Sequence, residues 1–270
     1  QVKQNVETLF LDEKLFPQTL AVLRTRMRHT GIEIITGDYK RFTFEKPCFG
    51  AILQYPNSEG SVVDYRAFTE KAHAADCKVA VATDLMALVL LTPPGEWGAD
   101  IAFGSSQRFG VPMFYGGPSA AFFATRDEYK RSMPGRIIGI SKDANGREAL
   151  RMALQTREQH IKREKATSNI CSNHAHNALV ATLYMALLGK QGLKAVALQS
   201  AQKAHALHAR IERMERYRPR FSGPFFNEFV VESNVEPEVL QKELMEQYIL
   251  GPLPLKHFYR ESFYDHLCMF

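Results

Sequence analysis

The sequence predicts an α/β fold built on a mostly parallel sheet. Short apolar runs alternate with helical patterns along the first half of the chain, at the spacing that is typical of strands joined by helices. The runs are of the buried type, which parallel sheets favour because helices cover both of their faces. Polar side chains follow two of these runs, at Asp84 and at residues 105–107. Ligands gather beyond the carboxyl ends of such strands.

The elements of this first unit follow in chain order. A helix is expected over residues 16–27, with Pro17 in its first turn and Gly31 as its stop. A second helix is expected over residues 65–77. Apolar strands are expected at residues 32–36, 49–55, 78–83, 100–104 and 120–125.

The second half of the chain changes character. A long helix is predicted from Asn173 to Arg218, broken near Gly189 and Gly192. After a turn at 219–223 we expect a strand at 225–232, a helix at 237–248, and the start of another strand within 249–270. We therefore predict a large domain over residues 1–190 that lacks its N-terminal segment. A connecting helix and an incomplete small α+β domain would occupy residues 191–270.

Composition limits the classes of function. The net charge of +5 and the pI near 9.0 favour acidic partners, or a compartment such as the mitochondrial matrix. Charge alone does not indicate nucleic acid, and no nucleic-acid motif is present. The longest apolar run, residues 85–91, is too short for a membrane span of about 20 residues. The four cysteines and nine histidines form no established metal-site or disulfide pattern, so we expect no metal.

A basic segment, residues 155–171, is the densest feature of the chain. It holds Arg157, Lys162, Arg163 and Lys165, and Arg151 precedes it. Such charge runs are often solvated helix faces. Here, however, the cations lie just before the long helix, where Thr167, Ser168 and Asn169 can act as caps and where cations oppose the helix dipole unless an anion is near. The segment is therefore interpreted as a contact surface. Cys171 beside it is a reactive thiol or, more simply, a buried inert one.

The polar strand ends carry the candidate chemistry. Asp84 is the kind of carboxylate that pairs with a protonated ring nitrogen, or it caps the next turn. Ser106 and Gln107 follow the next strand. A Schiff base at this position would need a lysine amine, and the carboxamide of Gln107 cannot form one.

Several long blocks resemble glycine decarboxylase, the P-protein of the glycine cleavage system. The matching blocks are Pro-Gly-Glu-Trp-Gly-Ala-Asp-Ile at 94–101, Gly-Ser-Ser-Gln-Arg-Phe-Gly-Val-Pro at 104–112, Tyr-Gly-Gly-Pro at 115–118, Met-Pro-Gly-Arg at 133–136 and the whole segment 155–171. Residues 53–60 and 226–231 extend the match. The blocks are colinear and cover most of the chain.

The resemblance implies a fold and different roles for two halves of the enzyme. In this family each of two related halves or subunits has the aspartate-aminotransferase-like fold of type I pyridoxal phosphate (PLP) enzymes, and the cofactor lysine belongs to the C-terminal half. This chain resembles the N-terminal half, with Gln107 at the lysine position. We therefore expect no covalent PLP here, PLP in a lysine-bearing partner half or subunit, and a hetero- or homo-oligomer. Asp84, Ser106 and Gln107 would be a degenerate cofactor pocket.

The resemblance also implies an activity that needs both halves. Glycine forms an imine with PLP, loses carbon dioxide and passes its aminomethyl group to the lipoyl arm of H-protein. We expect no residue of this chain to catalyse alone. The residues expected at the partner interface or the lipoyl channel are Arg157, His160, Lys165, Thr167, Ser168 and Asn169.

The chain also departs from the family pattern. Ser119 stands where a histidine is usual after Gly-Gly-Pro, and Ser172 to His174 replace Thr-Ala-Gln. The alternative function is therefore a catalytically inactive homologue that serves as a structural subunit of a larger assembly. The expected location is the mitochondrial matrix or, alternatively, the bacterial cytoplasm.

Overall fold

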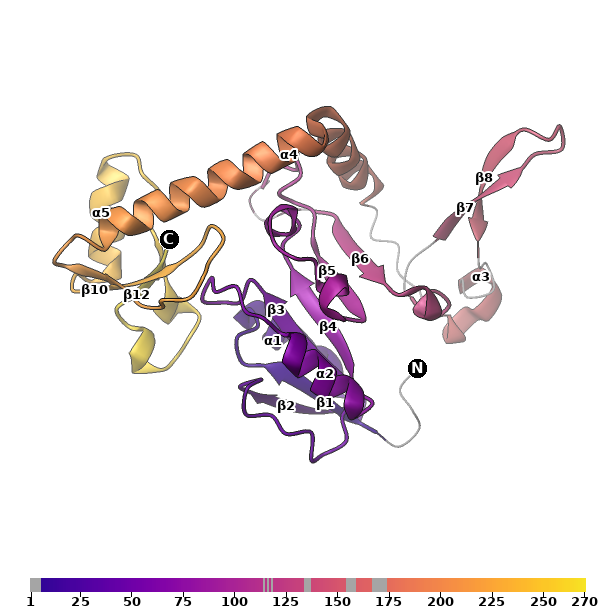
Figure 1. The fold of residues 1–270 in the computed structure, drawn as a ribbon, viewed down its shortest axis with the longest axis horizontal. Coiled ribbons are helices and arrows are strands. Elements are labelled where there is room, and N and C mark those ends of the chain that lie inside the picture. Colours follow the sequence, from indigo (N-terminus) through magenta and orange to yellow (C-terminus); the bar gives the residue numbers. More distant parts are fainter. Residues whose placement is uncertain are drawn as a thin grey trace.

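The computed structural model describes residues 6–113, 115, 117, 119–133, 137–153, 159–166 and 174–270. Its centre is a six-stranded sheet with the order β2-β1-β3-β4-β5-β6 (Figure 1). The strands are β1 (Thr8–Asp12), β2 (Glu33–Gly37), β3 (Gly50–Tyr55), β4 (Lys78–Thr83), β5 (Ile101–Ser105) and β6 (Ala121–Thr125). All neighbours are parallel except β5 and β6. The predicted mostly parallel α/β sheet is confirmed, although β1 was not predicted.

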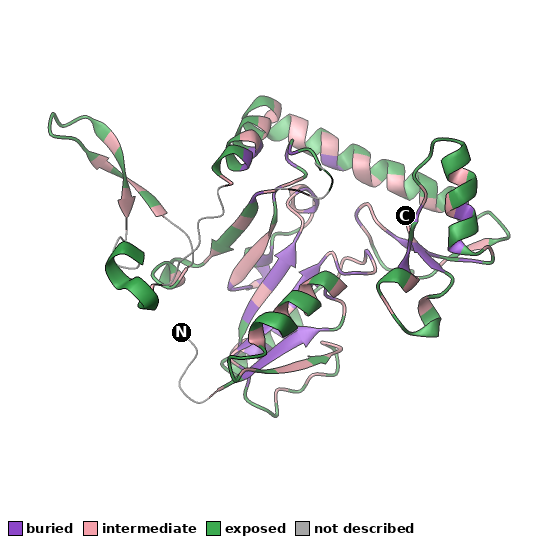
Figure 2. Cartoon of the chain, turned by 180° about the vertical axis from the view of Figure 1, so that it is seen from behind, coloured by how far each residue is buried: buried purple, intermediate pink, exposed green. Residues whose placement is uncertain are grey.

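Strand alternation divides the core between the two faces of the sheet. In β1, Phe10 packs into one apolar cluster with Leu53 and Val81, whereas Leu9 and Leu11 pack into another with Ala82. Successive side chains of a strand point to opposite faces, so these clusters lie on opposite sides. Figure 2 shows the buried strands at the centre of this sheet.

One helix covers each of these faces. Helix α2 (Arg66–Ala74) buries Phe68 and Ala72 in the cluster of Phe10. Helix α1 (Pro17–Met27) has no fully buried residue, but Leu20 and Leu23 pack against the cluster of Leu9 and Leu11. The centre of the sheet is therefore sandwiched between helices, which explains why β1, β3 and β4 are buried on both sides.

A long helix, α4 (Ala175–Ile211), leads from the six-stranded sheet to a second sheet (Figure 1). It kinks at Gly189, whose φ of 59° and ψ of −174° are not helical, as the predicted break near this glycine anticipated. Gly192 lies within the helix. The predicted helix end at Arg218 is wrong, because residues 217–219 form a strand of the second sheet instead.

The second sheet is antiparallel, with the order β11-β12-β10-β9. Its elements are β9 (Tyr217–Pro219), β10 (Val230–Ser233), α5 (Pro237–Glu246), β11 (Leu253–Pro254) and β12 (Leu267–Met269). The strand predicted at 225–232 is shorter than expected. This arrangement fits the predicted start of a small α+β domain, while a boundary at residue 190 stays a prediction.

In the sequence, a separate hairpin lies between the strands of the first sheet and those of the second. Strands β7 (Ile137–Lys142) and β8 (Glu148–Ala153) pair only with each other among the described strands, and they were not predicted. Helix α3 (Gln159–Lys162) follows. Short 3₁₀ helices occupy 87–89, 94–97, 127–129, 163–165, 255–257 and 262–264. No described helix is long and apolar enough to cross a membrane.

Candidate functional site

Three charged side chains are linked by ion pairs at the carboxyl ends of β4 and β5. Asp84 follows β4, and its Oδ2 lies 3.4 Å from Nε of Arg108, which comes shortly after β5. Nη2 of the same guanidinium lies 3.6 Å from Oε1 of Glu228. Arg108 thus joins a carboxylate of the parallel sheet to one that precedes β10 in the small sheet.

Asp84 also stabilises its own turn. Its Oδ1 accepts a hydrogen bond from the backbone N–H of Met86 at 3.0 Å, and its carbonyl accepts one from Leu88 N–H at 3.1 Å. Both carboxylate oxygens of Asp84 therefore have partners within the chain, one a guanidinium and one a backbone amide. This geometry corresponds to the capping role that the sequence left open.

Ser106 and Gln107 are engaged in their own loop. The buried Ser106 hydroxyl donates to the carbonyl of Ala120 at 3.0 Å. The Gln107 backbone N–H donates to Ser105 Oγ at 3.1 Å, and its side-chain Nε2 donates to the carbonyl of Val111 at 2.8 Å. The carboxamide therefore stabilises the 107–111 turn, which the sequence did not predict.

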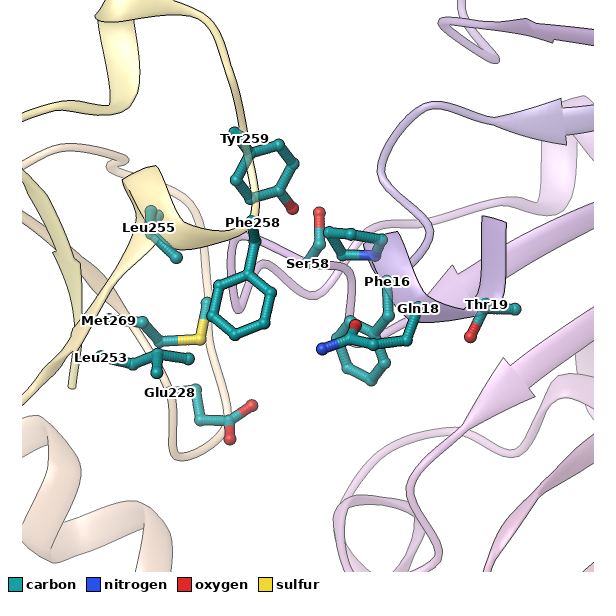
Figure 3. Close-up of a pocket in the computed structure, with 11 residues that line it drawn as sticks. Phe16, Gln18, Thr19, Ser58, Glu228, Leu253, Leu255, Phe258, Tyr259 and Met269 are labelled. Carbon is teal, nitrogen blue, oxygen red and sulfur yellow. The ribbon is translucent and has the colours of Figure 1, made fainter. Parts of the chain in front are cut away.

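Glu228 also lines a pocket of about 340 Å³ between the start of α1 and the small sheet (Figure 3). Most of the lining is apolar: Phe16, Pro17, Leu253, Leu255, Phe258 and Met269 surround the polar groups of Gln18, Thr19, Ser58, Glu228 and Tyr259. Burial raises the pKa of Glu228, the Arg108 charge lowers it, and the net direction is upward. The pocket suits an apolar group better than an anion, because its one charged group is a carboxylate.

Sequence reasoning missed a buried carboxyl at the end of β1. Asp12 is fully buried; its Oδ1 lies 3.4 Å from Lys14 N–H, and its Oδ2 lies 3.3 Å from the Tyr65 hydroxyl. Burial raises the pKa of Asp12 from 3.8 to about 6, against the lowering effect of these hydrogen bonds. An aspartate that ends an apolar run, as in Leu9-Phe10-Leu11-Asp12, was the available signal.

The residues around Asp12 connect the large sheet to the small one. Lys14 forms an ion pair with Glu59. Burial lowers the pKa of Lys14, but this pairing outweighs burial and the pKa is raised overall. Burial also raises the pKa of Tyr259 and Tyr264, which face the same region from the small sheet.

The predicted contact residues fall into two groups. Arg157, Thr167, Ser168 and Asn169 lie outside the described residues, as does the neighbouring Cys171. His160 in α3 and Lys165 in the following 3₁₀ turn are exposed. Among the described residues, no hydrogen bond or ion pair joins either of them to Asp84, Arg108 or Glu228. Helix α3 lies beyond β6, at the base of the hairpin (Figure 1). The described residues also contain no group of His, Cys, Asp and Glu that could hold a metal ion.

Comparison with known proteins identifies the family. The family model of the glycine cleavage system P-protein matches residues 1–258. The chain belongs to the P-protein family. This P-protein chain is 62% identical over 197 residues to glycine dehydrogenase (decarboxylating) of Bacteroides thetaiotaomicron, which covers 73% of this chain and 21% of that protein. It is 47% identical over 239 residues to the mitochondrial protein of that name from Dictyostelium discoideum, over 88% of this chain and 24% of that one.

Solved structures agree with this assignment. A crystal structure of inhibitor-bound glycine decarboxylase (P-protein) matches with a TM-score of 0.90 and 34% identity, over 98% of this chain and 61% of that one. Aspartate aminotransferase from Thermus thermophilus matches with a TM-score of 0.62 and 14% identity, over 99% and 72%. The resemblance to the P-protein and the aspartate-aminotransferase-like fold are both confirmed. The chain spans about a fifth of the length of these curated relatives.

The Arg108 bridge leads to a first prediction. We expect Arg108→Met to raise the pKa of Glu228 further and to lower the free energy of unfolding by about 1 kcal/mol near neutral pH. The loss of stability is small because both charged groups of this ion pair are partly exposed to solvent. Carboxyl titration by NMR and urea denaturation measure the two effects. Arg26→Met, on the exposed surface of α1, is the control. An unchanged Glu228 pKa in Arg108→Met would contradict the bridge.

Proposed function

We propose that this chain belongs to the non-cofactor, N-terminal half of a glycine decarboxylase. In this role it supports PLP-dependent glycine decarboxylation, and aminomethyl transfer to the lipoyl arm of H-protein, in an active site completed by a lysine-bearing half or subunit. One observation carries the proposal. Gln107 follows β5 at the position where an imine would need an amine, and its amide is already donated to the Val111 carbonyl.

The strand-end residues do not fit covalently bound PLP in this chain. A carboxylate that pairs with a protonated ring nitrogen must face an open pocket, whereas Asp84 faces the Arg108 guanidinium and the Met86 amide. Gln107 has no amine to offer. We therefore place PLP in the partner half, and we assign to this chain the tasks of binding, orienting and shielding.

The exposed basic residues suit such a supporting task. His160 and Lys165 extend from α3 and its 3₁₀ continuation into solvent. With Arg157, Thr167, Ser168 and Asn169 we assign them to the surface that meets the partner half or borders the lipoyl channel. Their role would be positioning and electrostatic, because cations attract and orient an acidic H-protein without transferring a proton. A mitochondrial matrix or a bacterial cytoplasm suits this system, and we propose the matrix first.

A second candidate function is a catalytically inactive homologue that acts as a structural subunit of a larger assembly. The internal pairing of Asp84 with Arg108 favours it, because a strand-end carboxylate neutralised within the chain needs no cofactor. The departures at Ser119 and at residues 172–174 point the same way.

Native mass spectrometry of the purified particle separates these functions. The decarboxylase proposal predicts a stoichiometric, lysine-bearing P-protein half, on the same polypeptide or on a second one. The particle should also show the visible absorbance of a PLP imine, and peptide mapping should find the imine on that half alone. Unrelated partners without the chromophore would support the structural subunit instead.

The basic segment gives a second prediction. Reversing one charge, Arg157→Glu, should reduce lipoyl-dependent exchange of the glycine carboxyl with carbon dioxide by about tenfold, since the segment would then repel an acidic partner. The exchange rate is measured in the assembled enzyme, with Arg28→Glu on the exposed end of the first helix as a charge-matched control. Equal rates in the two variants would remove the segment from the shared site.

A further inference from the structure

The hairpin formed by β7 and β8 has one apolar face. Ile138 pairs with Met152 across the ladder, and Ile140 pairs with Leu150. Paired residues share a face and residues two apart lie on the same side, so all four side chains point the same way. The side chains of the opposite face are smaller or more polar: Ile137, Gly139, Ser141, Ala149, Arg151 and Ala153. We call the first surface the hairpin apolar face.

Three of the four side chains of this face are exposed in the structure. Ile138, Ile140 and Leu150 are 58%, 73% and 72% exposed. The hairpin extends away from both sheets (Figure 1), and its outer residues are exposed in the reverse view (Figure 2). An isolated two-stranded hairpin is marginally stable in water, and alternation of apolar and small or polar residues is typical of an antiparallel pair with one covered face. The hairpin apolar face is therefore a candidate docking surface.

The tip of the hairpin is organised without help from the rest of the chain. Asp143 Oδ1 accepts hydrogen bonds from the N–H groups of Asn145 and Arg147 at 2.8 and 2.9 Å. The Asp143 carbonyl accepts one from Gly146, which has a φ of +77°. The turn thus holds the two strands in register before any partner arrives, which lowers the entropic cost of docking.

Charge indicates the kind of surface that fits. Residues 126–166, which contain the hairpin, carry eleven of the chain's 34 Lys and Arg and six of its 29 Asp and Glu. The remainder of the chain is balanced, so the whole net charge of +5 resides in this region. Two copies meeting face to face across a two-fold axis would bring these positive regions together. A partner with an apolar patch and an acidic rim is favoured over a second copy.

The position of the hairpin in the chain indicates which partner this is. β8 ends at Ala153, and the basic segment that we assign to the partner contact begins at residue 155. α3, within that segment, lies at the base of the hairpin (Figure 1). One docking surface can therefore include the exposed cations of α3 and the hairpin apolar face.

We propose that the β7–β8 hairpin docks its apolar face onto the cofactor-bearing half of the enzyme, against an apolar patch bordered by Asp and Glu side chains. This inference rests on the proposed function, because it takes its partner from there. The hairpin would then be an arm through which the non-cofactor half holds the half that performs the chemistry.

Site-specific photocrosslinking in the assembled natural enzyme tests this assignment. Leu150→p-benzoylphenylalanine and Ile140→p-benzoylphenylalanine place the probe on the hairpin apolar face. Ala149→p-benzoylphenylalanine places it on the opposite face of the same strand. After irradiation, mass spectrometry identifies the crosslinked peptides. We expect about tenfold more product from Leu150 and Ile140 than from Ala149, since adjacent strand residues face opposite sides.

Each outcome decides the proposal. Crosslinks from both apolar positions to peptides of the cofactor-bearing half, with Asp or Glu near the attachment point, would support it. Crosslinks to H-protein, to a second copy of this chain or to its own sheets would overturn it, as would no crosslink in a particle that contains the cofactor-bearing half. A particle without that half would overturn both the docking proposal and the proposed function. A PLP-loaded particle in which the hairpin positions give no crosslink would overturn the docking proposal alone.

Discussion

Gly60→Ala is expected to destabilise the protein strongly, because the added methyl group would overlap the backbone of another segment. A Cβ at this position would lie 2.1 Å from the carbonyl oxygen of Glu228 and 2.7 Å from its carbon. The obstacle is backbone, so no side-chain rotation relieves it. In addition, the φ of Gly60 is +81°, a region that side chains other than glycine rarely adopt.

The close approach at Gly60 has a structural purpose. Asn57 Oδ1 accepts hydrogen bonds from the N–H groups of Glu59 and Ser61, both at 2.9 Å, and so shapes the loop after β3. The next residue, Val62, donates its N–H to the Pro224 carbonyl at 2.7 Å, and Ser61 bridges to Phe225. The loop therefore carries the backbone contact between the large sheet and the chain that enters β10.

We expect Gly60→Ala to lower the free energy of unfolding by at least about 4 kcal/mol, since overlap with the backbone adds to conformational strain. Gly31→Ala is the matched control. Gly31 has a similar φ of +76°, but a Cβ there would meet nothing within 4 Å, so strain alone should cost about 1 kcal/mol. Urea denaturation of both variants measures the difference. A cost at Gly60 no greater than at Gly31 would contradict the backbone contact.

The sequence predicted those strands that can be recognised from their own composition. β3 and β4 are continuous apolar runs bounded by turn residues, so both their type and their limits follow from composition. β1 was missed although it is buried throughout, because its apolar run, residues 9–11, is too short to be told from a loop by composition. The missed hairpin contains Gly139 and owes its form to cross-strand pairing, which no single window contains.

Helix α4 shows where tertiary structure overrides local preference. Residues 212–216 include Glu, Arg and Met, which are good helix formers, and the predicted helix continued through them. The helix instead ends at Ile211. Ladder pairing of Tyr217 with Ser233 and of Arg218 with Glu232 draws the chain into the small sheet. Such pairing depends on a strand that lies some fifteen residues further on and cannot be read from the helix itself.

The candidate site was predictable only in part, for the same reason. The rule that ligand sites gather at the carboxyl ends of parallel strands selects Asp84 and Gln107 from sequence. It does not select Glu228, which reaches Arg108 only because the small sheet returns to the large one. Nor does it reveal that Asp12 is buried beside the Tyr65 hydroxyl. A carboxyl's neighbours, more than its own position, decide its pKa.

Asp12→Asn is the second change with a large expected effect, and its sign depends on pH. Burial holds the pKa of Asp12 at about 6 in the folded state, above its ordinary 3.8. Below about pH 3 the carboxyl is protonated in both the folded and the unfolded chain, so it has no effect on pH dependence. As pH rises toward 6 the unfolded chain ionises first, and the free energy of unfolding falls. Above pH 7 the fold contains a buried carboxylate, which costs about 3 kcal/mol.

Asparagine removes that cost because it stays neutral and keeps the size of aspartic acid. Its amide oxygen can accept from Lys14 N–H, and its amide nitrogen can donate to the Tyr65 hydroxyl, which lies 3.2 Å from the Gln54 carbonyl and can donate there. We therefore expect Asp12→Asn to match the parent protein at about pH 3 and to exceed it by about 3 kcal/mol at pH 8. Urea denaturation at a series of pH values measures this difference, with the exposed Asp127→Asn as control. A variant that gains no stability between about pH 3 and pH 8 relative to the parent would show that Asp12 ionises freely in the folded protein.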